Sequence, residues 1–308
     1  MKIFLSKINE SWVVDRFRRD WYLNNPDIST EKIKDSDIIW IISPWLWKKI
    51  PKKQLEQKKV VCSIYHIDFD SFSESDQKEF NLMNSYVDIY HVISDHTKIQ
   101  LNKLTNKKIV SIPFWVDNKI FKNLVDKSNL RKSLGFNNKD FLIGSFQRDT
   151  EGKDLKSPKL IKGPDIFLEI IKKYYAQSMN STVILTGKRR DYLINNFKKY
   201  DIKYKYFEML NLEEVNKLYN ILDLYIVSSR VEGGPQAIME CAISKTPIVS
   251  TDVGIAPQLL NPISIYKNVE DFKNVRPDTN FAFNKAIKYV IPNGMYQYLE
   301  MFKEIYEN

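Results

Sequence analysis

The feature that most constrains the fold of this chain is a repeated alternation between short apolar runs and longer, polar, helix-compatible segments. Each apolar run has the length of a β-strand, and the segments between them include residues 73–85 and 164–175. Alternation of this kind predicts parallel β-sheets that are flanked by helices. The ten runs span residues 2–5, 37–42, 59–65, 88–93, 108–112, 141–146, 181–187, 203–209, 223–229 and 246–251.

The alternation pauses once, between residues 112 and 136, where the sequence contains a proline and shows no apolar period. Such a segment indicates a linker, so we place a domain boundary near Asp126. A chain of 308 residues is long for one core and suits two domains of ~150 residues each. We therefore expect two doubly wound α/β domains, at residues 1–125 and 126–290, followed by a helix within residues 291–308.

Ligands of open α/β sheets bind beyond the carboxyl ends of the strands. Two such domains in tandem create a cleft, and we expect the chemistry of this chain to be found at these strand ends. The segments concerned are residues 6–12, 65–70, 146–163, 187–190 and 228–240.

The stretch EGGPQAIME, residues 232–240, holds two glutamates on either side of a Gly-Gly-Pro break. The two glycines let a ligand approach the backbone closely, and Pro235 fits the first position of a helix whose free N–H groups suit an anion or sugar hydroxyls. Glu232 would lie in the turn and Glu240 in the helix, both facing a ligand. A structural alternative makes Glu232 a helix cap and Glu240 a solvated surface residue. The apolar neighbours of Glu240 argue against it, because an unpaired carboxylate among them is costly.

Charge and cysteine content narrow the class of protein. The chain has 47 Lys and Arg against 38 Asp and Glu, a net charge of +9, which favours anionic partners. It has no basic helix or recognised nucleic-acid module, so we expect no nucleic-acid binding. Two cysteines are too few for a disulfide framework, and no apolar run approaches the ~20 residues of a membrane span. Charged residues follow the first apolar run at once, so we expect no signal peptide and a cytoplasmic protein.

One basic segment, residues 43–53, combines Trp45 and Trp47 with four lysines. Aromatic and lysine residues together suit the interface of an anionic membrane, so peripheral contact with the inner membrane face is one interpretation. The alternative is a loop whose tryptophans pack inward while its lysines stay solvated.

The motifs of the second domain resemble a known family. Glu232 and Glu240 match the Glu-x(7)-Glu signature of the retaining glycosyltransferases of family 4. That family has the GT-B fold, two facing Rossmann-like domains with a C-terminal helix that crosses back to the first domain. The resemblance implies that residues 1–125 form the acceptor side, that residues 126–290 bind the nucleotide-sugar donor and that residues 291–308 hold the crossover helix. The resemblance covers most of residues 59–254. The other segments that agree with the family, in its order, are SIYHID (63–68), FLIGSFQR (141–148), KGPDIFLEII (162–171) and the long stretch at 218–254.

The resemblance implies a role for each matching residue. Arg148 and Lys162 would bind the diphosphate of a nucleotide-sugar donor, Glu232 would orient the donor sugar, and Glu240 would hold the ribose hydroxyls. His66 would lie near the reacting sugar as a hydrogen-bonding partner. The remaining donor-binding candidates are Gly144, Gly187, Gly233, Gly234, Pro235 and Gln236.

The implied function is transfer of a sugar from a nucleotide sugar, with UDP or GDP as the carrier, to a hydroxyl of a glycan or lipid-linked acceptor. Cell-surface glycan or glycolipid synthesis is the implied setting. The family's usual mechanism is front-face attack assisted by the donor phosphate. It needs no covalent nucleophile and no metal, so we expect no cofactor. Two alternatives remain open: a nucleotide-sugar-binding protein without transfer activity, and an epimerase or phosphorylase of the same fold.

The chain departs from the family in the spacer between Arg148 and Lys162, which is longer than usual. Lys153, Lys156 or Lys159 could supply the positive charge in place of Lys162, or the spacer could be a mobile lid. The family's Gly-rich turn after the first strand is replaced here by SKINESW, residues 6–12.

A rival interpretation concerns Asp68 and Asp70, which resemble the Asp-x-Asp metal clamp of the other glycosyltransferase fold, GT-A. Together with His66 they could hold Mn or Mg. For His91 and His96 we expect structural roles.

Overall fold

The computed structural model describes residues 1–7, 13–176 and 180–307. The chain forms two compact units, Met1–Trp115 with Ile291–Asn308, and Val116–Val290. The division therefore falls at residue 116, whereas the sequence placed the boundary near Asp126. Residues beyond 116 belong to the second unit because Asn216 and Asn220 accept hydrogen bonds from the backbone N–H groups of Lys122 and Leu124, at 3.2 and 2.7 Å.

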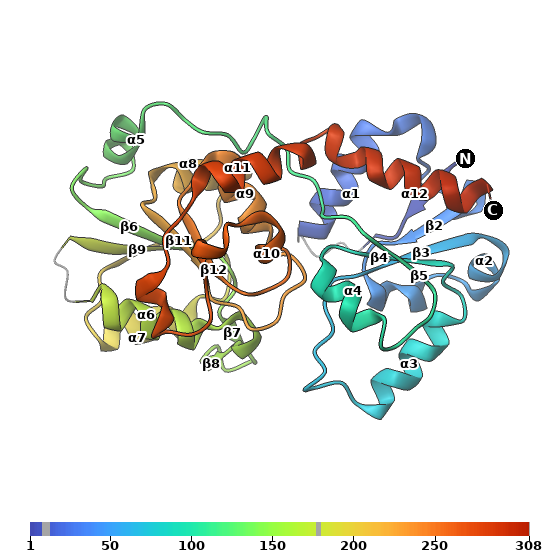
Figure 1. The fold of residues 1–308 in the computed structure, drawn as a ribbon, viewed down its shortest axis with the longest axis horizontal. Helices are drawn as coiled ribbons and strands as arrows, with labels where there is room; N and C mark the ends of the chain where they lie inside the picture. The colour runs from blue at the N-terminus through green and yellow to red at the C-terminus, as the bar shows by residue number, and fades with distance from the viewer. Residues whose placement is uncertain (8–12, 177–179, 308) are drawn as a thin grey trace. The chain divides into compact units, whose positions relative to one another are not determined.

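The first unit is built on a parallel sheet with strand order β1-β2-β3-β4-β5 (Figure 1). The predicted strands of this half are all present, so the expectation of a parallel sheet is confirmed. The strands are β1 (Ile3–Leu5), β2 (Ile38–Ile41), β3 (Lys59–Ile64), β4 (Ile89–Val92) and β5 (Lys108–Ser111). The helices are α1 (Val13–Asn24), α2 (Lys52–Gln57), α3 (Glu74–Asn84), α4 (Asp95–Leu101) and α12 (Tyr296–Glu307).

Helices cover both faces of this sheet. On one face Trp21 of α1 packs edge-on against Trp40 of β2, with ring centroids 5.4 Å apart. On the other face Phe80 of α3 stacks on Tyr90 of β4 at 5.8 Å. Helix α1 lies on the face opposite to α3 because the chain takes a different route after it. It first forms a parallel bridge from Ser29 to Ile3, at the edge of β1 that does not pair with β2, and only then proceeds to β2.

The C-terminal helix α12 belongs to the first unit. Its residue Phe302 packs against Trp40, with centroids 5.2 Å apart, and its Tyr298 hydroxyl donates to the carbonyl oxygen of Ile112 at 3.1 Å. The buried residues of this terminal segment are Met295, Tyr298, Met301, Phe302 and Ile305. The predicted return of the last helix to the first domain is therefore confirmed.

His91 lies at the centre of this core and has a structural role, as expected. Its Nε2 lies 2.8 Å from the carbonyl oxygen of Ile112, which can only accept, so Nε2 carries the proton and Nδ1 accepts from the Ser63 hydroxyl at 2.8 Å. Burial lowers the pKa of His91 from 6.5 to about 4. The imidazole is therefore neutral in the folded protein at pH 7.

The second unit is built on a parallel sheet with strand order β10-β9-β6-β11-β12-β13. Its strands are β6 (Phe141–Ser145), β9 (Ser181–Thr186), β10 (Tyr204–Phe207), β11 (Leu224–Val227), β12 (Ile248–Thr251) and β13 (Ile265–Tyr266), and β7 (Thr150–Glu151) with β8 (Ser157–Pro158) forms a separate hairpin. Its helices are α5 (Lys127–Ser133), α6 (Pro164–Tyr174), α7 (Asp191–Lys199), α8 (Leu212–Ile221), α9 (Gln236–Ser244), α10 (Ala256–Leu259) and α11 (Thr279–Ala286).

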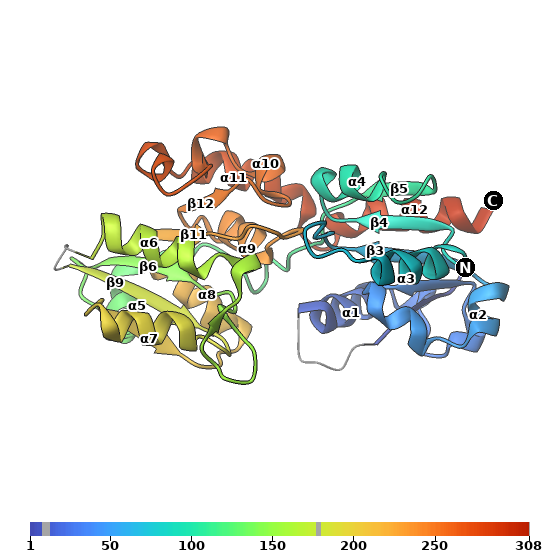
Figure 2. The ribbon, with the colours of Figure 1, turned by 90° about the horizontal axis from the view of Figure 1, so that it is seen from below.

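Two apolar cores lie on the opposite faces of the second sheet. Leu142 and Ile184 face the core formed with α8 to α11, whereas Ile143 and Val183 face the core formed with α6 and α7. This follows from the strand period of two, which sends consecutive side chains to opposite faces. Figure 2 views this sheet from the side on which α6 and α7 lie. Both faces are covered, so these strands are apolar throughout, as a doubly wound sheet requires.

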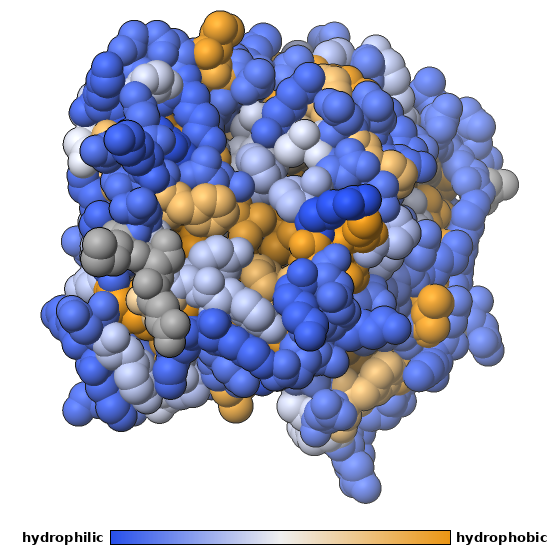
Figure 3. Space-filling model, turned by 60° about the vertical axis from the view of Figure 1, so that its left-hand side comes forward, coloured by the Kyte–Doolittle hydropathy of each residue, from blue (hydrophilic) through white to orange (hydrophobic). Residues whose placement is uncertain are grey.

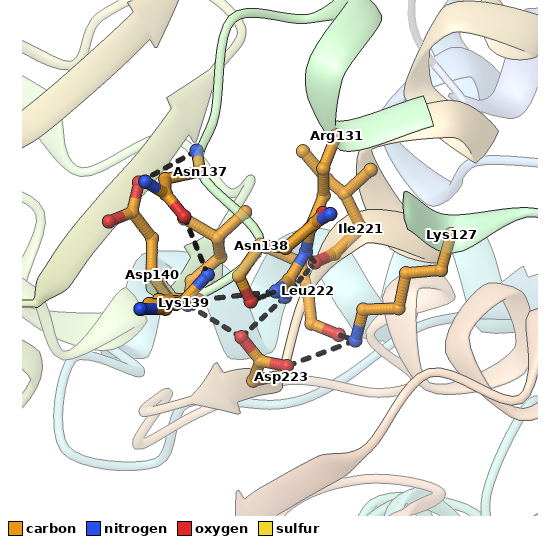
Figure 4. A network of polar contacts seen from close by, with 10 residues as sticks. Lys127, Arg131, Asn137, Asn138, Lys139, Asp140, Ile221, Leu222 and Asp223 are labelled. Atoms are coloured by element: carbon orange, nitrogen blue, oxygen red, sulfur yellow. Dashed lines mark hydrogen bonds and ion pairs between the residues drawn. The ribbon is translucent and has the colours of Figure 1, made fainter. Parts of the chain in front are cut away.

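A network of charges fixes α5 to the second sheet at the point where its two central strands, β6 and β11, begin (Figure 4). The buried guanidinium of Arg131 donates to the Ile221 carbonyl oxygen at 2.6 Å and to Asp223 at 2.5 Å. Asp223 also accepts from Lys127 at 3.0 Å and from the backbone N–H of Leu142, the second residue of β6, at 2.8 Å. Helix α5, strand β6 and the approach to β11 are therefore joined at one point.

The face of the molecule in Figure 3 is covered mostly by hydrophilic residues, in keeping with a chain in which 28% of residues are charged. Within the described ranges, no helix is long and apolar enough to cross a membrane.

Replacing Arg131 by methionine tests this network. Arg131→Met leaves Asp223 and the Ile221 carbonyl without their guanidinium donor, and we expect the free energy of unfolding to fall by about 3 kcal/mol. Lys132→Met, at the exposed neighbouring position, is the matched control and should change it by less than about 0.5 kcal/mol. Urea unfolding measures both, and equal effects of the two variants would contradict the role of the network.

The pKa of His91 predicts how stability depends on pH. The unfolded chain binds the proton near pH 6.5 and the folded protein near pH 4, so the free energy of unfolding should fall as the pH is lowered through this interval. The contribution of this single group reaches about 3 kcal/mol. Urea unfolding of the wild type and of His91→Gln at several pH values isolates the effect. Between pH 4 and 6.5 the free energy of unfolding should depend on pH less steeply in the variant, by the amount that corresponds to one proton. An unchanged slope would show that His91 is not the responsible group.

Candidate active site

The candidate site lies where the strand order of the second sheet reverses. Numbered along the chain, the order of this sheet is 3-2-1-4-5-6, and the reversal falls between β6 and β11, which pair through Ile143 and Leu224. Ligands of doubly wound sheets bind at this switch point, beyond the carboxyl ends of the strands. The chain continues from β6 to Arg148 and from β11 to Glu232, so both candidates follow the two strands that form it.

The turn after β11 is held by backbone contacts. The N–H groups of Arg230 and Val231 both donate to the Ile161 carbonyl oxygen, at 2.9 and 3.1 Å. A Cβ atom on Gly254, whose φ is +53°, would lie 2.2 Å from the Gly233 carbonyl oxygen, so only glycine allows this approach. The EGG turn is therefore packed in place.

Lys162 and Glu232 form an ion pair in this site. Their side chains are only 20% and 13% exposed, so the pair is shielded from water. The Lys162 carbonyl oxygen accepts from the Gln147 amide at 2.8 Å, which ties the lysine to the loop after β6. Gly163, which follows, has φ +61°, and a Cβ on it would lie 1.8 Å from the Ser228 carbonyl oxygen. Lys162 thus reaches Glu232 because Gly163 lets the backbone lie against the end of β11.

Three cations, Arg148, Lys159 and Lys162, lie near one another in the site. Burial, followed by repulsion from Arg148 and Lys162, lowers the pKa of Lys159. Desolvation and the nearby Arg189 lower the pKa of Arg148, whose Nε donates to the Thr150 carbonyl oxygen at 2.9 Å. Like charges held together in this way favour an anion between them, and a phosphate is the anion that Arg and Lys bind best.

Lys159 is the residue of the spacer that joins this group. The sequence left Lys153, Lys156 and Lys159 as equal alternatives, and the structure separates them. Lys153 and Lys156 lie exposed on the β7–β8 hairpin, whereas Lys159 comes after it and is half-buried. The spacer is therefore a short hairpin, which accounts for its length.

A buried ion pair that the sequence analysis did not single out supports the loop of Arg148. Arg190 Nε lies 2.8 Å from Asp149 Oδ2, both side chains are almost fully buried, and a guanidinium N–H of Arg190 donates to the Gln147 carbonyl oxygen. Burial raises the pKa of Asp149, and Arg190 opposes this rise. Because Asp149 directly follows Arg148, the pair fixes the backbone from which Arg148 projects. The sequence did hint at Asp149 and Arg190, since both lie shortly after the ends of expected strands, β6 and β9.

Glu240 is buried, with 7% of its surface exposed, and its Oε2 accepts from the Tyr219 hydroxyl at 2.8 Å. The alternative of a solvated surface residue is therefore wrong. Glu232 does not cap α9 either, because the residue before the helix is Pro235 and no side chain caps it. Pro235 thus lies one position before the helix that it was expected to begin.

The other donor-binding candidates occupy distinct positions. Gly144 lies inside β6, where a Cβ would meet the Leu222 side chain at 2.3 Å, so packing accounts for this glycine. Gly187 follows β9 with φ +88°, and a Cβ on it would make an ordinary contact, 3.8 Å from the Phe146 carbonyl oxygen. Gln236 is the half-buried first residue of α9, and Gly234 lies half-buried in the turn before it. Their contacts with a donor stay predictions.

His66 lies in the first unit, two residues after β3, where it is half-buried and lines a pocket of that unit. Asp68 accepts from the backbone N–H of Asp70 and from the Ser71 hydroxyl at 3.3 and 2.9 Å, so it is engaged in its own turn. Among the described residues, no three His, Cys, Asp or Glu side chains form a group that could hold a metal. Of the segment at residues 6–12, residues 8–12 lie outside the described part of the chain.

Comparison with known proteins shows what the domain that carries the site is similar to. Residues 126–275 match the family model described as "Glycosyl transferases group 1". This match makes the segment that holds the site similar to that family. No match was found among curated proteins.

Solved structures extend the likeness to nearly the whole chain. HepE of Anabaena, solved in complex with UDP-glucose, aligns with a TM-score of 0.74 at 16% identity, covering 98% of this chain and 99% of that chain. Sucrose-phosphate synthase of Thermosynechococcus elongatus gives 0.73 at 11% identity, over 98% and 81% of the two chains. A glycosyltransferase of Rickettsia africae gives 0.68 at 17%, over 98% and 84%. At these identities the likeness is one of fold, and the predicted GT-B fold is confirmed.

Substitution of Gly163 tests whether the backbone approach to Ser228 builds the site. In Gly163→Ala the new Cβ must displace the Ser228 carbonyl, whereas in Gly135→Ala, where φ is +77°, it meets only the end of the Lys205 side chain at 3.4 Å. Both variants carry the strain of a left-handed alanine, about 1–2 kcal/mol. We expect urea unfolding to show this loss for Gly135→Ala and a clearly larger one for Gly163→Ala. Equal losses would mean that the contact with Ser228 is unimportant.

Proposed function

We propose that this protein is a retaining glycosyltransferase of family 4 that transfers a sugar from a UDP- or GDP-sugar to an acceptor hydroxyl without a metal. The observation that carries the proposal is the group of Arg148, Lys159 and Lys162 beside Glu232, at the switch point of a domain similar to the group 1 glycosyl transferases. The buried Glu240 lies on the helix that follows the same turn.

The cations would act on the leaving group. When the bond between the sugar C1 and the donor phosphate breaks, its electron pair passes to the phosphate oxygen, and negative charge grows there. Fixed positive charges at that place stabilise the transition state more than the ground state, which is what accelerates the reaction. Arg148 and Lys162 therefore take the catalytic roles that the sequence predicted, and Lys159 joins them.

The Lys162–Glu232 pair gives donor binding a specific consequence. A diphosphate competes with Glu232 for the Lys162 ammonium, so a bound donor would free the Glu232 carboxylate to accept hydrogen bonds from the sugar hydroxyls. Glu240 would accept from the ribose hydroxyls. Binding of the donor diphosphate would thus release the Glu232 carboxylate that orients the donor sugar.

Retention of configuration needs no covalent nucleophile in this scheme. The acceptor oxygen bonds to C1 on the face that the phosphate leaves, and the acceptor proton passes to the departing phosphate oxygen. The role predicted for His66 is to form a hydrogen bond with the donor or the acceptor near the reacting sugar.

Two features bear on donor and acceptor. HepE was solved with UDP and with UDP-glucose, which makes UDP-sugars the first donors to test. The acceptor would be a glycan or lipid-linked molecule, in cell-surface glycan or glycolipid synthesis in the cytoplasm. For contact with an anionic inner membrane face, Trp45 is the available indole, since Trp47 is only 5% exposed.

Calorimetric titration with UDP-glucose and GDP-mannose in EDTA tests the donor site. We expect one of them to bind, with its dissociation constant raised at least tenfold, about 1.4 kcal/mol, in Arg148→Ala and in Glu240→Gln. Lys173→Ala is the control, because Lys173 pairs with Glu270 on the surface of the same unit. Binding that requires Mn or that survives both substitutions would contradict the proposed site.

Turnover then separates the alternatives. A transferase forms a glycosylated acceptor and releases the nucleoside diphosphate, whereas an epimerase changes the donor without an acceptor and a phosphorylase needs free phosphate. A protein that binds the donor and does none of these would be a binding protein of the same fold.

A further inference from the structure

The first unit contains a pocket of about 360 Å³, a volume within the range of small-molecule sites. It lies between the segment after β2, the segment after β3 and helix α3, and all of its lining residues belong to this unit. Its position at the carboxyl ends of β2 and β3 is the place where open α/β sheets receive ligands. The lining residues that bear on its chemistry are Trp45, Trp47, Asp68, Phe72, Asp76 and Glu79.

One wall of the pocket is aromatic. Trp45, which is 45% exposed, and the half-buried Phe72 both belong to the lining. An indole held at a pocket with its surface accessible offers a flat apolar area of the kind that a ligand covers by stacking.

Trp47 completes the aromatic part of the lining. It is only 5% exposed and its Nε1 is closed off from solvent, so the indole contributes apolar surface and no donor that a ligand could reach.

The charged groups of the lining are all acidic. Asp68, Asp76 and Glu79 line the pocket, and no Lys or Arg is among its described lining residues. Hydrogen bonds from Ser73 lower the pKa of Asp76, so this carboxylate is ionised at neutral pH. Glu79 Oε1 is paired with Lys48 at 2.8 Å, which holds its side chain at the pocket. Carboxylates accept hydrogen bonds from hydroxyls and repel anions.

We propose that this pocket binds a neutral sugar residue, with one ring face stacked on Trp45 and its hydroxyls donating to the carboxylates. The proposal rests on the proposed function in one respect, since it takes the bound sugar to be part of the acceptor. It adds the substrate class: the acceptor group at this pocket is uncharged, and a phosphate of a lipid-linked acceptor would have to lie outside it.

A matched pair of probes tests the proposal, phenyl β-D-glucopyranoside and its 6-phosphate, which differ by one phosphate group. Saturation-transfer NMR titration without any donor measures binding to the full chain. We expect the neutral glucoside to bind, and its 6-phosphate to bind at least tenfold more weakly. Trp45→Ala should weaken binding of the glucoside at least tenfold, and Tyr306→Ala, which removes an exposed ring on α12, should leave it unchanged.

The outcomes separate this proposal from the donor site. Binding of the glucoside with the expected variant pattern supports the pocket even where UDP-glucose fails to bind, since the two are titrated independently. The proposal is overturned if neither probe binds, if the 6-phosphate binds as well as the neutral glucoside, or if Trp45→Ala has no effect. It is also overturned if Trp45→Ala reduces binding to vesicles of one part phosphatidylglycerol and three parts phosphatidylcholine while glucoside binding is unchanged.

Discussion

The candidate site depends on one close backbone contact, between Gly163 and the end of β11. A residue with a side chain cannot occupy position 163 without displacing the Ser228 carbonyl, because its Cβ would lie 1.8 Å from that oxygen. This contact brings the segment before α6 against the turn after β11, and Lys162 reaches Glu232 as a result. Two residues that are 70 positions apart in sequence thus become one charged unit. The contact of Gly254 with Gly233 holds the same turn from its other side.

The site also depends on charged side chains that are buried beneath it. Asp149 and Arg190 are paired out of contact with water, and such a pair is stable only while both partners are present. Its geometric effect is more important than its energy, because it fixes the loop that carries Arg148. Glu240 is likewise buried with Tyr219 as a donor. The site therefore combines rigid, buried support with cations at its mouth, and a preorganised field of this kind is what transition-state stabilisation requires.

Much of the fold could be predicted from the sequence, because each buried strand of a doubly wound sheet must be apolar on both faces. All ten expected strands are present, whereas the two-residue strands β7, β8 and β13 were missed, since two residues carry no period. The position of Glu240 could be predicted from its apolar neighbours. Lys159 could not be separated from Lys153 and Lys156, because their exposure depends on the hairpin. Inward packing of the tryptophans at residues 43–53 was one of the alternatives, but which of Trp45 and Trp47 is buried depends on tertiary packing. The pairing of Asp149 with Arg190 depends on it too, and leaves no local pattern.

The return of α12 to the first unit has a consequence for how the protein is made. The core around Trp40 and His91 needs Tyr298 and Phe302, which the ribosome adds almost 200 residues after the last strand of that sheet, β5 (Lys108–Ser111). The second unit, Val116–Val290, is continuous in sequence and contains its own cores, so it can fold as soon as it emerges. The two units are therefore completed in the reverse of the order in which they begin to be translated. The first unit can complete its core only after residues 291–307 have been added.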